Sequence, residues 1–329
     1  MDSVWYLDKE SIMKVIVAGS AGFIGHNLTK ELLKCGHEVI GVDDFSTGLR
    51  ANISACRGLG VFKFYEESIT NKNVCKYFEG VDVVFLLAAL ARVQLSIDNP
   101  IETNAVNVGG SINVLEAARA SGVKRVVFSS SSSIYGGKAE LPSKESAKPN
   151  PLSPYALQKL SGEYYMKIYS DLYDHLDTVS LRYFNVIGPH QRTGQKVAYA
   201  TVIPAILDKA VNGGIFIING SGDVSRDFSP VENVVSANIL AANHPGKLNG
   251  EVFNIGCGQT TTINQVYDKI CDLAGYKIPK INGPARVGDP KKSLADITKA
   301  QEVLGYKVLV GLDESLANTY AWWMGGCKT

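Results

Sequence analysis

The chain has 329 residues, of which 45% are hydrophobic and 20% are charged, and its 33 lysines and arginines against 32 aspartates and glutamates leave a net charge of +1. This balance is typical of a globular protein with a sizeable core, and the absence of a basic run argues against nucleic acid or an anionic membrane surface as a partner. No apolar run approaches the roughly 18 residues of a membrane span, and residues 1–14 lack the apolar core of a signal peptide, so we expect a cytoplasmic protein.

The cysteines indicate a reducing compartment. Six of them lie at positions 35, 56, 75, 257, 271 and 327, without any CxxC pair and without a histidine cluster beside them. Such spacing favours free thiols and no structural metal site.

Strand and helix patterns alternate through the first half of the chain. Strands are expected at 14–18, 39–42, 81–89, 125–129 and 178–183, and helices at 23–35, 101–120 and 155–173. The nine apolar residues of 81–89 are typical of a strand that is buried on both faces. This alternation predicts an α/β fold, with a Rossmann-type doubly wound parallel sheet and helices on both faces.

The local amino-acid composition changes after Gly188-Pro189, where clusters of glycine, proline and polar residues become more frequent. Helical patterns recur at 202–211, 231–243, 263–274, 298–304 and 312–322. We therefore place a boundary near residue 188, between a first domain of residues 1–188 and a smaller α/β domain of residues 189–329. Segments of about 228–258 are expected to pack back on the first domain.

A glycine-rich motif joins the first strand to the first helix. Gly19-Ser20-Ala21-Gly22-Phe23-Ile24-Gly25 stands where a dinucleotide fingerprint requires its glycines, at a tight turn that lets backbone approach a pyrophosphate. Asp43 ends the second strand, 18 residues after Gly25, where a carboxylate accepts hydrogen bonds from the adenine ribose and repels a 2′-phosphate. The motif predicts NAD rather than NADP; the alternative is a glycine turn with a surface Asp.

A second motif opens the helix at 155–173. Ser153 suits the N-cap and Pro154 the first helical position, which places Tyr155 and Lys159 one turn apart on the same face. A tyrosine has a pKa of about 10, so it serves as a base near neutral pH only when nearby positive charge lowers that value. Lys159, the positive end of the helix and a nicotinamide cation are the expected sources. Alone, such a pair is more often a chance pair on a surface; next to the glycine motif it indicates catalysis.

The serine run 129–133 follows a buried strand and is interpreted as its carboxyl end, where ligands of such sheets bind. A serine hydroxyl there can bond a substrate oxygen and relay a proton to Tyr155. The alternative is a solvated strand end.

Taken together, GSAGFIG, VDDFSTG, NVGGSINVLEAA, SSSSSIYG, SPYALQK, LRYFNVIG and GSGDVSRDF resemble the extended short-chain dehydrogenases/reductases of the UDP-hexose 4-epimerase type, from Met13 to about Trp323. The resemblance implies a catalytic triad of Ser131, Tyr155 and Lys159, a tightly bound NAD, a UDP-sugar substrate and a homodimer formed through a helix bundle. It makes 1–188 the NAD-binding domain and 189–329 the nucleotide-sugar-binding domain.

The resemblance also assigns two sets of binding positions. The cofactor positions besides Tyr155 and Lys159 are Gly19, Gly22, Phe23, Ile24, Gly25, Asp43, Ser46, Ile69, Leu87, Ala88, Ala89 and Asn107, the last on a helix that supports the site. The substrate positions are Ser131, Ser132, Ser133, Asn185, Val202, Ile218, Arg226, Arg286, Asp289 and Ser293.

Two positions depart from the family pattern. Glu67-Ser68-Ile69 stands where Gly-Asp-Ile is common, and Leu86 stands where a histidine is common. Both leave the triad intact and bear on cofactor affinity.

The implied reaction is 4-epimerisation through a 4-keto sugar. In the family that the chain resembles, one position limits the size of the substituent on sugar carbon 2, and counting back from Ala295-Asp296 assigns this gate to Ser293. The small side chain therefore predicts UDP-GlcNAc/UDP-GalNAc interconversion with some UDP-glucose/UDP-galactose activity. A strict UDP-glucose 4-epimerase remains the alternative. A 4,6-dehydratase or decarboxylase carries an acidic residue after the catalytic hydroxyl, where this chain has Ser132 and Ser133. A non-catalytic dinucleotide sensor tends to lose the tyrosine or lysine that this chain keeps.

Overall fold

The computed structural model describes residues 12–191, 201–285 and 290–325. Its central element is a parallel sheet of seven strands in the order β11-β6-β5-β4-β1-β2-β3. The strands are β1 (Lys14–Ala18), β2 (Glu38–Asp43), β3 (Phe62–Glu66), β4 (Val83–Leu86), β5 (Arg125–Ser131), β6 (Asp177–Tyr183) and β11 (Glu251–Ile255). This is the Rossmann-type doubly wound sheet that the sequence predicts, and the order reverses between β1 and β4, where such sheets bind their ligands.

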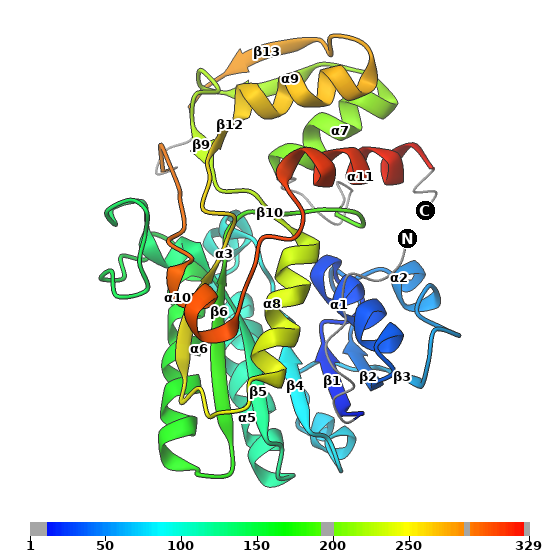
Figure 1. Ribbon diagram of the computed structural model, residues 1–329, viewed down its shortest axis with the longest axis vertical. Helices are drawn as coiled ribbons and strands as arrows, with labels where there is room; N and C mark the ends of the chain where they lie inside the picture. The colour runs from blue at the N-terminus through cyan, green and yellow to red at the C-terminus, as the bar shows by residue number, and fades with distance from the viewer. Residues whose placement is uncertain (1–11, 192–200, 286–289, 326–329) are drawn as a thin grey trace.

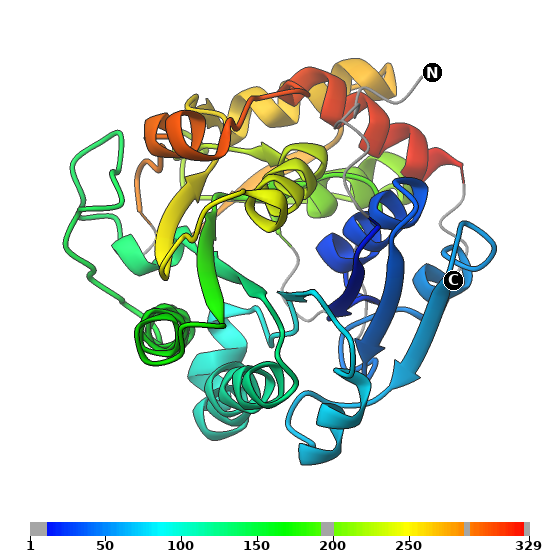
Figure 2. The same cartoon turned by 60° about the horizontal axis from the view of Figure 1, so that its bottom comes forward.

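Helices cover both faces of the sheet because alternate residues of each strand point to opposite sides. One face packs against α1 (Phe23–Lys34) and α8 (Val231–Asn243), and the other against α5 (Ser111–Ala120) and α6 (Pro154–Leu172). Figure 2 shows α5 and α6 on the opposite side of the sheet from α8. In β1, for example, Val15 and Val17 belong to the first core and Ile16 and Ala18 to the second.

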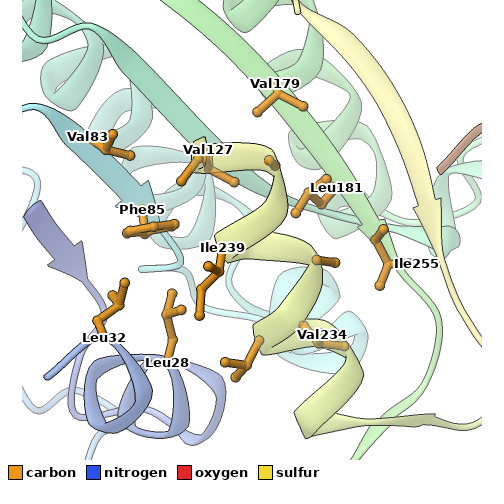
Figure 3. Packing of buried hydrophobic residues seen from close by; sticks show 14 of the residues in the cluster. Leu28, Leu32, Val83, Phe85, Val127, Val179, Leu181, Val234, Ile239 and Ile255 are labelled. Atoms are coloured by element: carbon orange, nitrogen blue, oxygen red, sulfur yellow. The ribbon is translucent and has the colours of Figure 1, made fainter. Parts of the chain in front are cut away.

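Figure 3 shows the first of these cores, in which α1 contributes Leu28 and Leu32 and α8 contributes Val234 and Ile239. All four side chains are at most 3% exposed. Because α8 and β11 come late in the chain, the segment 231–255 returns to the sheet that the first half of the chain builds. The boundary near residue 188 stays a prediction.

A second lobe lies beyond the carboxyl ends of the strands, at the top of Figure 1. It contains α7 (Val202–Asn212), α9 (Ile263–Ala274), α11 (Leu312–Met324) and the parallel pair β8 (Phe216–Asn219) and β13 (Lys280–Gly283), around an apolar core of its own. Two short pairs connect the lobe to the sheet. They are β7 (Val186–Ile187) with β10 (Ser229–Pro230), and β9 (Ser225–Arg226) with β12 (Thr261–Thr262).

The remaining elements border the sheet. They are α2 (Arg50–Ser54), η1 (Lys72–Tyr77), α3 (Val93–Asp98), α4 (Pro100–Asn104), the π-helical turn η2 (Ala105–Gly110), η3 (Ser132–Tyr135) and α10 (Thr298–Leu304). The expected helix 101–120 is thus the run α4-η2-α5. Within the described residues, no helix is both long and apolar enough to cross a membrane.

One expected strand is shorter than its apolar stretch. Residues 81–89 were expected to form one strand, but β4 covers only Val83–Leu86. The apolar residues continue because Leu87, Ala88 and Ala89 leave the sheet and line a crevice at its edge.

Candidate active site

The loop between β1 and α1 is built for close backbone approach. Gly19 has a φ of +89°, and a Cβ there would lie 2.7 Å from the Ala88 nitrogen. A Cβ on Gly25 would lie 2.0 Å from the Gly19 carbonyl oxygen, so α1 can cross the loop this closely only with glycine at both positions. Phe23 and Ile24 are the first residues of α1. The first backbone N–H groups of a helix have no carbonyl partners within the helix, so this end of α1 attracts anions.

A crevice opens beside this loop at the carboxyl ends of β1, β2 and β4. Seven of the predicted cofactor positions line it together: Gly19, Asp43, Ser46, Ile69, Leu87, Ala88 and Ala89. Asp44, Thr47, Glu67 and Val106 also line it, and the sequence reasoning did not assign them. Glu67 follows β3 directly, and an acidic residue at a strand end beside the fingerprint is the signal that would have found it.

Asp43 is held in place from two sides. Its carboxylate accepts hydrogen bonds from the backbone nitrogens of Ala21, at 3.0 Å, and Phe45, at 2.8 Å. Burial raises the pKa of Asp43, and these two amides oppose the rise. Carboxylate oxygens have about four lone-pair positions, so acceptor capacity remains for a ribose hydroxyl in the crevice.

Asn107 supports the crevice from behind. Asn107 is 2% exposed. Its side-chain oxygen accepts from the Leu90 backbone N–H at 2.8 Å, and its side-chain nitrogen donates to the Leu90 carbonyl at 3.2 Å. The same Asn107 nitrogen donates to the Gln158 side chain on α6 at 2.8 Å. Asn107 therefore ties the loop after β4 to the helix that carries Tyr155. Leu86, the departure from the family pattern, is fully buried in the core of the sheet rather than in the crevice.

The serine run is the carboxyl end of β5 and the start of η3, and each serine there has a different neighbour. The hydroxyls of Ser131 and Tyr155 share a hydrogen bond. Ser130 points the other way and donates to Glu163 at 2.5 Å. The Ser133 hydroxyl is buried and has no hydrogen-bond partner among the described residues, and Ser132 lies next to it at the start of η3.

Lys159 follows Tyr155 by one turn of α6 and is 3% exposed. Its Nζ donates to the Ser129 carbonyl at 2.7 Å and lies 4.9 Å from the centre of the Phe128 ring. Burial lowers the pKa of Lys159 to about 7, and Glu163, one turn further along the helix, opposes the change.

Tyr155 has a second cation near it that the sequence reasoning missed. Burial raises the pKa of Tyr155 above its ordinary value, whereas the bond with Ser131 and the positive charge of Arg92 lower it. Arg92 is the N-cap residue of α3, and its carbonyl accepts from the Ser96 backbone N–H at 3.0 Å. The Ser96 hydroxyl accepts from the Tyr155 backbone N–H at 3.0 Å, which links α3 to the start of α6. Arg92 is thus a cation that acts on Tyr155 in addition to Lys159, for which this electrostatic role stays a prediction.

Asn185, a predicted substrate position just beyond β6, connects two segments that are distant in the chain. Its side-chain amide donates to the Asp227 carbonyl at 3.1 Å and to the Ser293 hydroxyl at 3.2 Å. The buried Asp227 carboxylate in turn accepts from the backbone nitrogens of Cys257, Gly258 and Ala295. Burial raises the pKa of Asp227 to about 6, and these amides oppose the rise. Together they hold the segment with Ser293 against the end of the sheet.

Other predicted substrate positions lie in the second lobe. Val202 begins α7 and is half-buried, Arg226 ends β9 and donates to the Ser225 carbonyl at 2.8 Å, and Ile218 is buried in the lobe's apolar core. Arg286 and Asp289 lie outside the described residues. The described cysteines, at 35, 56, 75, 257 and 271, are all free thiols, as expected.

Comparison with known proteins agrees with this geometry. Residues 15–256 match the profile of the family described as NAD dependent epimerase/dehydratase. The chain belongs to this family. A UDP-glucose 4-epimerase of Mycolicibacterium smegmatis is 36% identical over 310 residues, which are 93% of this chain and 97% of that protein.

Two further members show how widely this part of the family varies in substrate. The UDP-N-acetylglucosamine 4-epimerase from Methanobrevibacter ruminantium, solved with UDP-N-acetylmuramic acid, superposes with a TM-score of 0.90 at 35% identity, covering 96% of this chain and 99% of that one. A UDP-glucuronate 4-epimerase of Thermodesulfobacterium geofontis is 32% identical over 316 residues, which are 93% of this chain and 95% of that protein. The epimerase is thus of the extended short-chain dehydrogenase/reductase type, with NAD as its cofactor.

Proposed function

We propose that this NAD-dependent UDP-sugar 4-epimerase interconverts UDP-GlcNAc and UDP-GalNAc, and also acts on the UDP-glucose/UDP-galactose pair. The observation that carries the choice of sugar is the place of Ser293. Its side chain is half-buried and 3.2 Å from the Asn185 amide at the carboxyl end of the sheet, the end at which Ser131 and Tyr155 meet. A small side chain at this wall leaves room for an acetamido group and offers it a hydroxyl.

The residues of the chain fit NAD. The glycines of the β1–α1 loop leave a cradle that a Cβ would fill, the start of α1 suits a pyrophosphate, and Asp43 suits the ribose hydroxyls. NAD, when bound, takes up and gives back the hydride at sugar carbon 4. Lys159, Tyr155 and the residues that line the crevice are the groups that we propose hold it.

Tyr155 and Ser131 carry the acid–base chemistry in this proposal. Tyr155 accepts the proton of the hydroxyl on carbon 4, with Ser131 bridging the two oxygens, and returns it after the sugar has presented its other face. The Arg92 guanidinium and the Lys159 ammonium stabilise the tyrosinate that this step requires. Asn185 and Arg226, with Arg286 and Asp289, are proposed to hold the UDP, which stays in place while the sugar turns.

The gate predicts a selective effect of Ser293→Tyr. A ring in place of the hydroxyl fills the space for the acetamido group, which should cost about 1 to 3 kcal/mol in binding the acetylated transition state. We expect kcat/KM for UDP-GlcNAc to fall about 10- to 100-fold and that for UDP-glucose to change by only a few-fold. The measurement is the rate of 4-epimer formation from each sugar, without added NAD.

Lys292→Tyr serves as the matched control, because it places the same ring on the exposed neighbouring position. It should leave both sugars unaffected. Equal losses of kcat/KM for both sugars with Ser293→Tyr would show that Ser293 does not decide which sugar is accepted. A parent enzyme that acts on UDP-glucose but not on UDP-GlcNAc is a strict UDP-glucose 4-epimerase, and one that retains NAD but turns over neither sugar favours the sensor.

We also propose a homodimer, formed through the outer faces of α4 and α6. On α6, Leu157, Tyr164, Ile168 and Leu172 follow the helical spacing of one stripe and are 47% to 66% exposed. Ile101 on the neighbouring α4 is 86% exposed. A second copy of the same stripe is a partner of matching chemistry, because a twofold axis brings identical faces together.

Charges within the stripe should therefore separate the two copies. We expect the Ile168→Glu, Leu172→Glu variant to sediment as a monomer at concentrations where the parent is a dimer, because two unpaired carboxylates would be buried in each half of the interface. Val303→Glu, at an exposed position of α10, is the control and should remain dimeric. A double variant with the sedimentation behaviour of the parent would place the interface elsewhere.

A further inference from the structure

Beneath the catalytic face of α6 lies a buried ion pair. The Arg182 guanidinium, on β6, donates to both carboxylate oxygens of Glu163, from Nε at 2.8 Å and from Nη2 at 2.7 Å. The two side chains are 4% and 5% exposed. Arg182 also donates to the Tyr135 hydroxyl at 2.8 Å, which in turn donates to Asn254 at 2.7 Å. The geometry of Glu163 is therefore set from the neighbouring strand, not from its own helix.

Glu163 is also bonded to the strand that carries the catalytic serine. Ser130 donates to it at 2.5 Å, and the residues on either side of Ser130 serve the site directly: the Ser129 carbonyl accepts from Lys159, and the Ser131 hydroxyl bonds Tyr155. One buried carboxylate thus joins β5, β6 and α6 directly below the triad. It also lies one turn from Lys159, which no carboxylate contacts directly among the described residues.

We propose that Glu163 is a positioning residue whose negative charge, held in place by Arg182 and Ser130, keeps the buried Lys159 ammonium protonated beside Tyr155. This inference rests on the proposed function of Tyr155 as the base. The physical need for it is plain, because an ammonium that is 3% exposed and bonded to one carbonyl is poorly compensated for the water that it has lost. A fixed carboxylate one turn away favours the charged form.

The other groups around Lys159 do not take this role. From α6 itself the titratable neighbours are Tyr155 and Glu163, and from α3 the charged neighbour is Arg92, a cation that acts on Tyr155. β5 contributes the Ser129 carbonyl and the Phe128 ring, neither of which is titratable. Arg182 on β6 is already paired with Glu163, and Tyr135 of η3 is bonded to Arg182. Glu116 of α5 accepts from the Tyr169 hydroxyl, which lies far along α6 from Lys159.

Removal of the negative charge of Glu163 should lower the pKa of Lys159. Burial lowers the pKa of Lys159 to about 7, and the negative charge of Glu163 opposes this fall. In Glu163→Gln the titration should move to lower pH, so that Lys159 is mostly neutral at pH 7. Tyr155 then loses a neighbouring cation, its own pKa rises, and the acid limb of the kcat/KM profile moves to higher pH.

The test is a titration of Lys159 by NMR, in protein whose lysines carry ¹³C at Cε, with the resonance assigned through Lys159→Met. We expect Glu163→Gln to lower the midpoint by about one pH unit or more relative to the parent. Ser130→Ala is the matched control: it removes a hydrogen bond to the same carboxylate but leaves its charge, so the midpoint should stay near that of the parent. Glu163→Asp, which restores the charge, should restore most of the midpoint.

Glu163→Gln leaves Arg182 without its ion-pair partner and so risks misfolding, which circular dichroism would show. The double variant Glu163→Gln, Arg182→Gln removes both buried charges together and should fold. It should lower the midpoint by less than Glu163→Gln alone, because the Arg182 cation, which disfavours the neighbouring ammonium, is removed as well. A Lys159 midpoint that does not move in either variant overturns the proposal, as does an equal shift in Ser130→Ala. Because the titration requires no turnover, its outcome is distinguishable from that of the proposed function, which is tested by the activity of the parent on the two sugar pairs.

Discussion

Tyr155→Phe is expected to lower the rate of epimerisation by about 10²- to 10⁴-fold, the usual contribution of a general acid–base group. The ring remains and only the hydroxyl is lost, so the proton of the sugar hydroxyl has no acceptor, and Ser131 loses the partner with which it shares a hydrogen bond. The helix and its N-cap are untouched, because Ser153 caps α6 through the Ala156 nitrogen at 3.2 Å. The measurement is the single-turnover rate, together with the melting temperature and the NAD content.

Tyr164→Phe is the control for this prediction. It makes the same change on the same helix, at a side chain that is 60% exposed. Its rate should equal that of the parent. If Tyr155→Phe also remains within a few-fold of the parent, the triad assignment is wrong.

Gly25→Ala should abolish NAD retention and destabilise the fold by at least about 3 kcal/mol, at the upper end of what an overpacked position costs. The new Cβ would lie 2.0 Å from the Gly19 carbonyl oxygen, and the atoms in its way are backbone, so no side chain can turn aside. Either α1 moves away from the loop or the loop gives up the conformation with a φ of +89° at Gly19. Both outcomes displace the α1 amides from the place of the pyrophosphate.

Bound nucleotide per chain after gel filtration and the free energy of unfolding in urea measure these two effects. Gly109→Ala is the control, since a Cβ at this helical glycine of η2 meets nothing within 4 Å. It should keep the parent's NAD content and stability. An unchanged NAD content in Gly25→Ala would show that the loop is not the pyrophosphate site.

Local patterns predicted much of the molecule. The alternation of strand and helix, the bounds of α6 and the helices of the second lobe follow from hydrophobic period and capping, which act between residues a few positions apart. The Ser153 cap is an example: the predicted N-cap accepts from Ala156 in the structure. The glycine motif and Asp43 likewise belong to one βαβ unit, so their spacing alone predicted that they would share a crevice.

The serine run shows where such reasoning ends. Its place at the carboxyl end of a strand could be predicted from the buried stretch before it. Which serine faces Tyr155 and which faces Glu163 depends on the register of β5 against β6, in which Ser131 lies beside Tyr183. That register is a pairing between residues far apart in the chain.

The doubly wound sheet, the glycine cradle and the Tyr155–Lys159 pair can be predicted from the chain alone, because each depends on contiguous residues and their spacing. Three other features follow from the packed fold: Arg92 is a further cation near Tyr155, Asn107 reaches Gln158 across 51 positions, and Asn185 meets Ser293 across 108. Such contacts form when the sheet brings strand ends and loops to one edge, and no periodicity records them. The charge environment of Lys159 belongs to the same class, because burial and the Arg182–Glu163 pair exist only once β5, β6 and α6 have packed together.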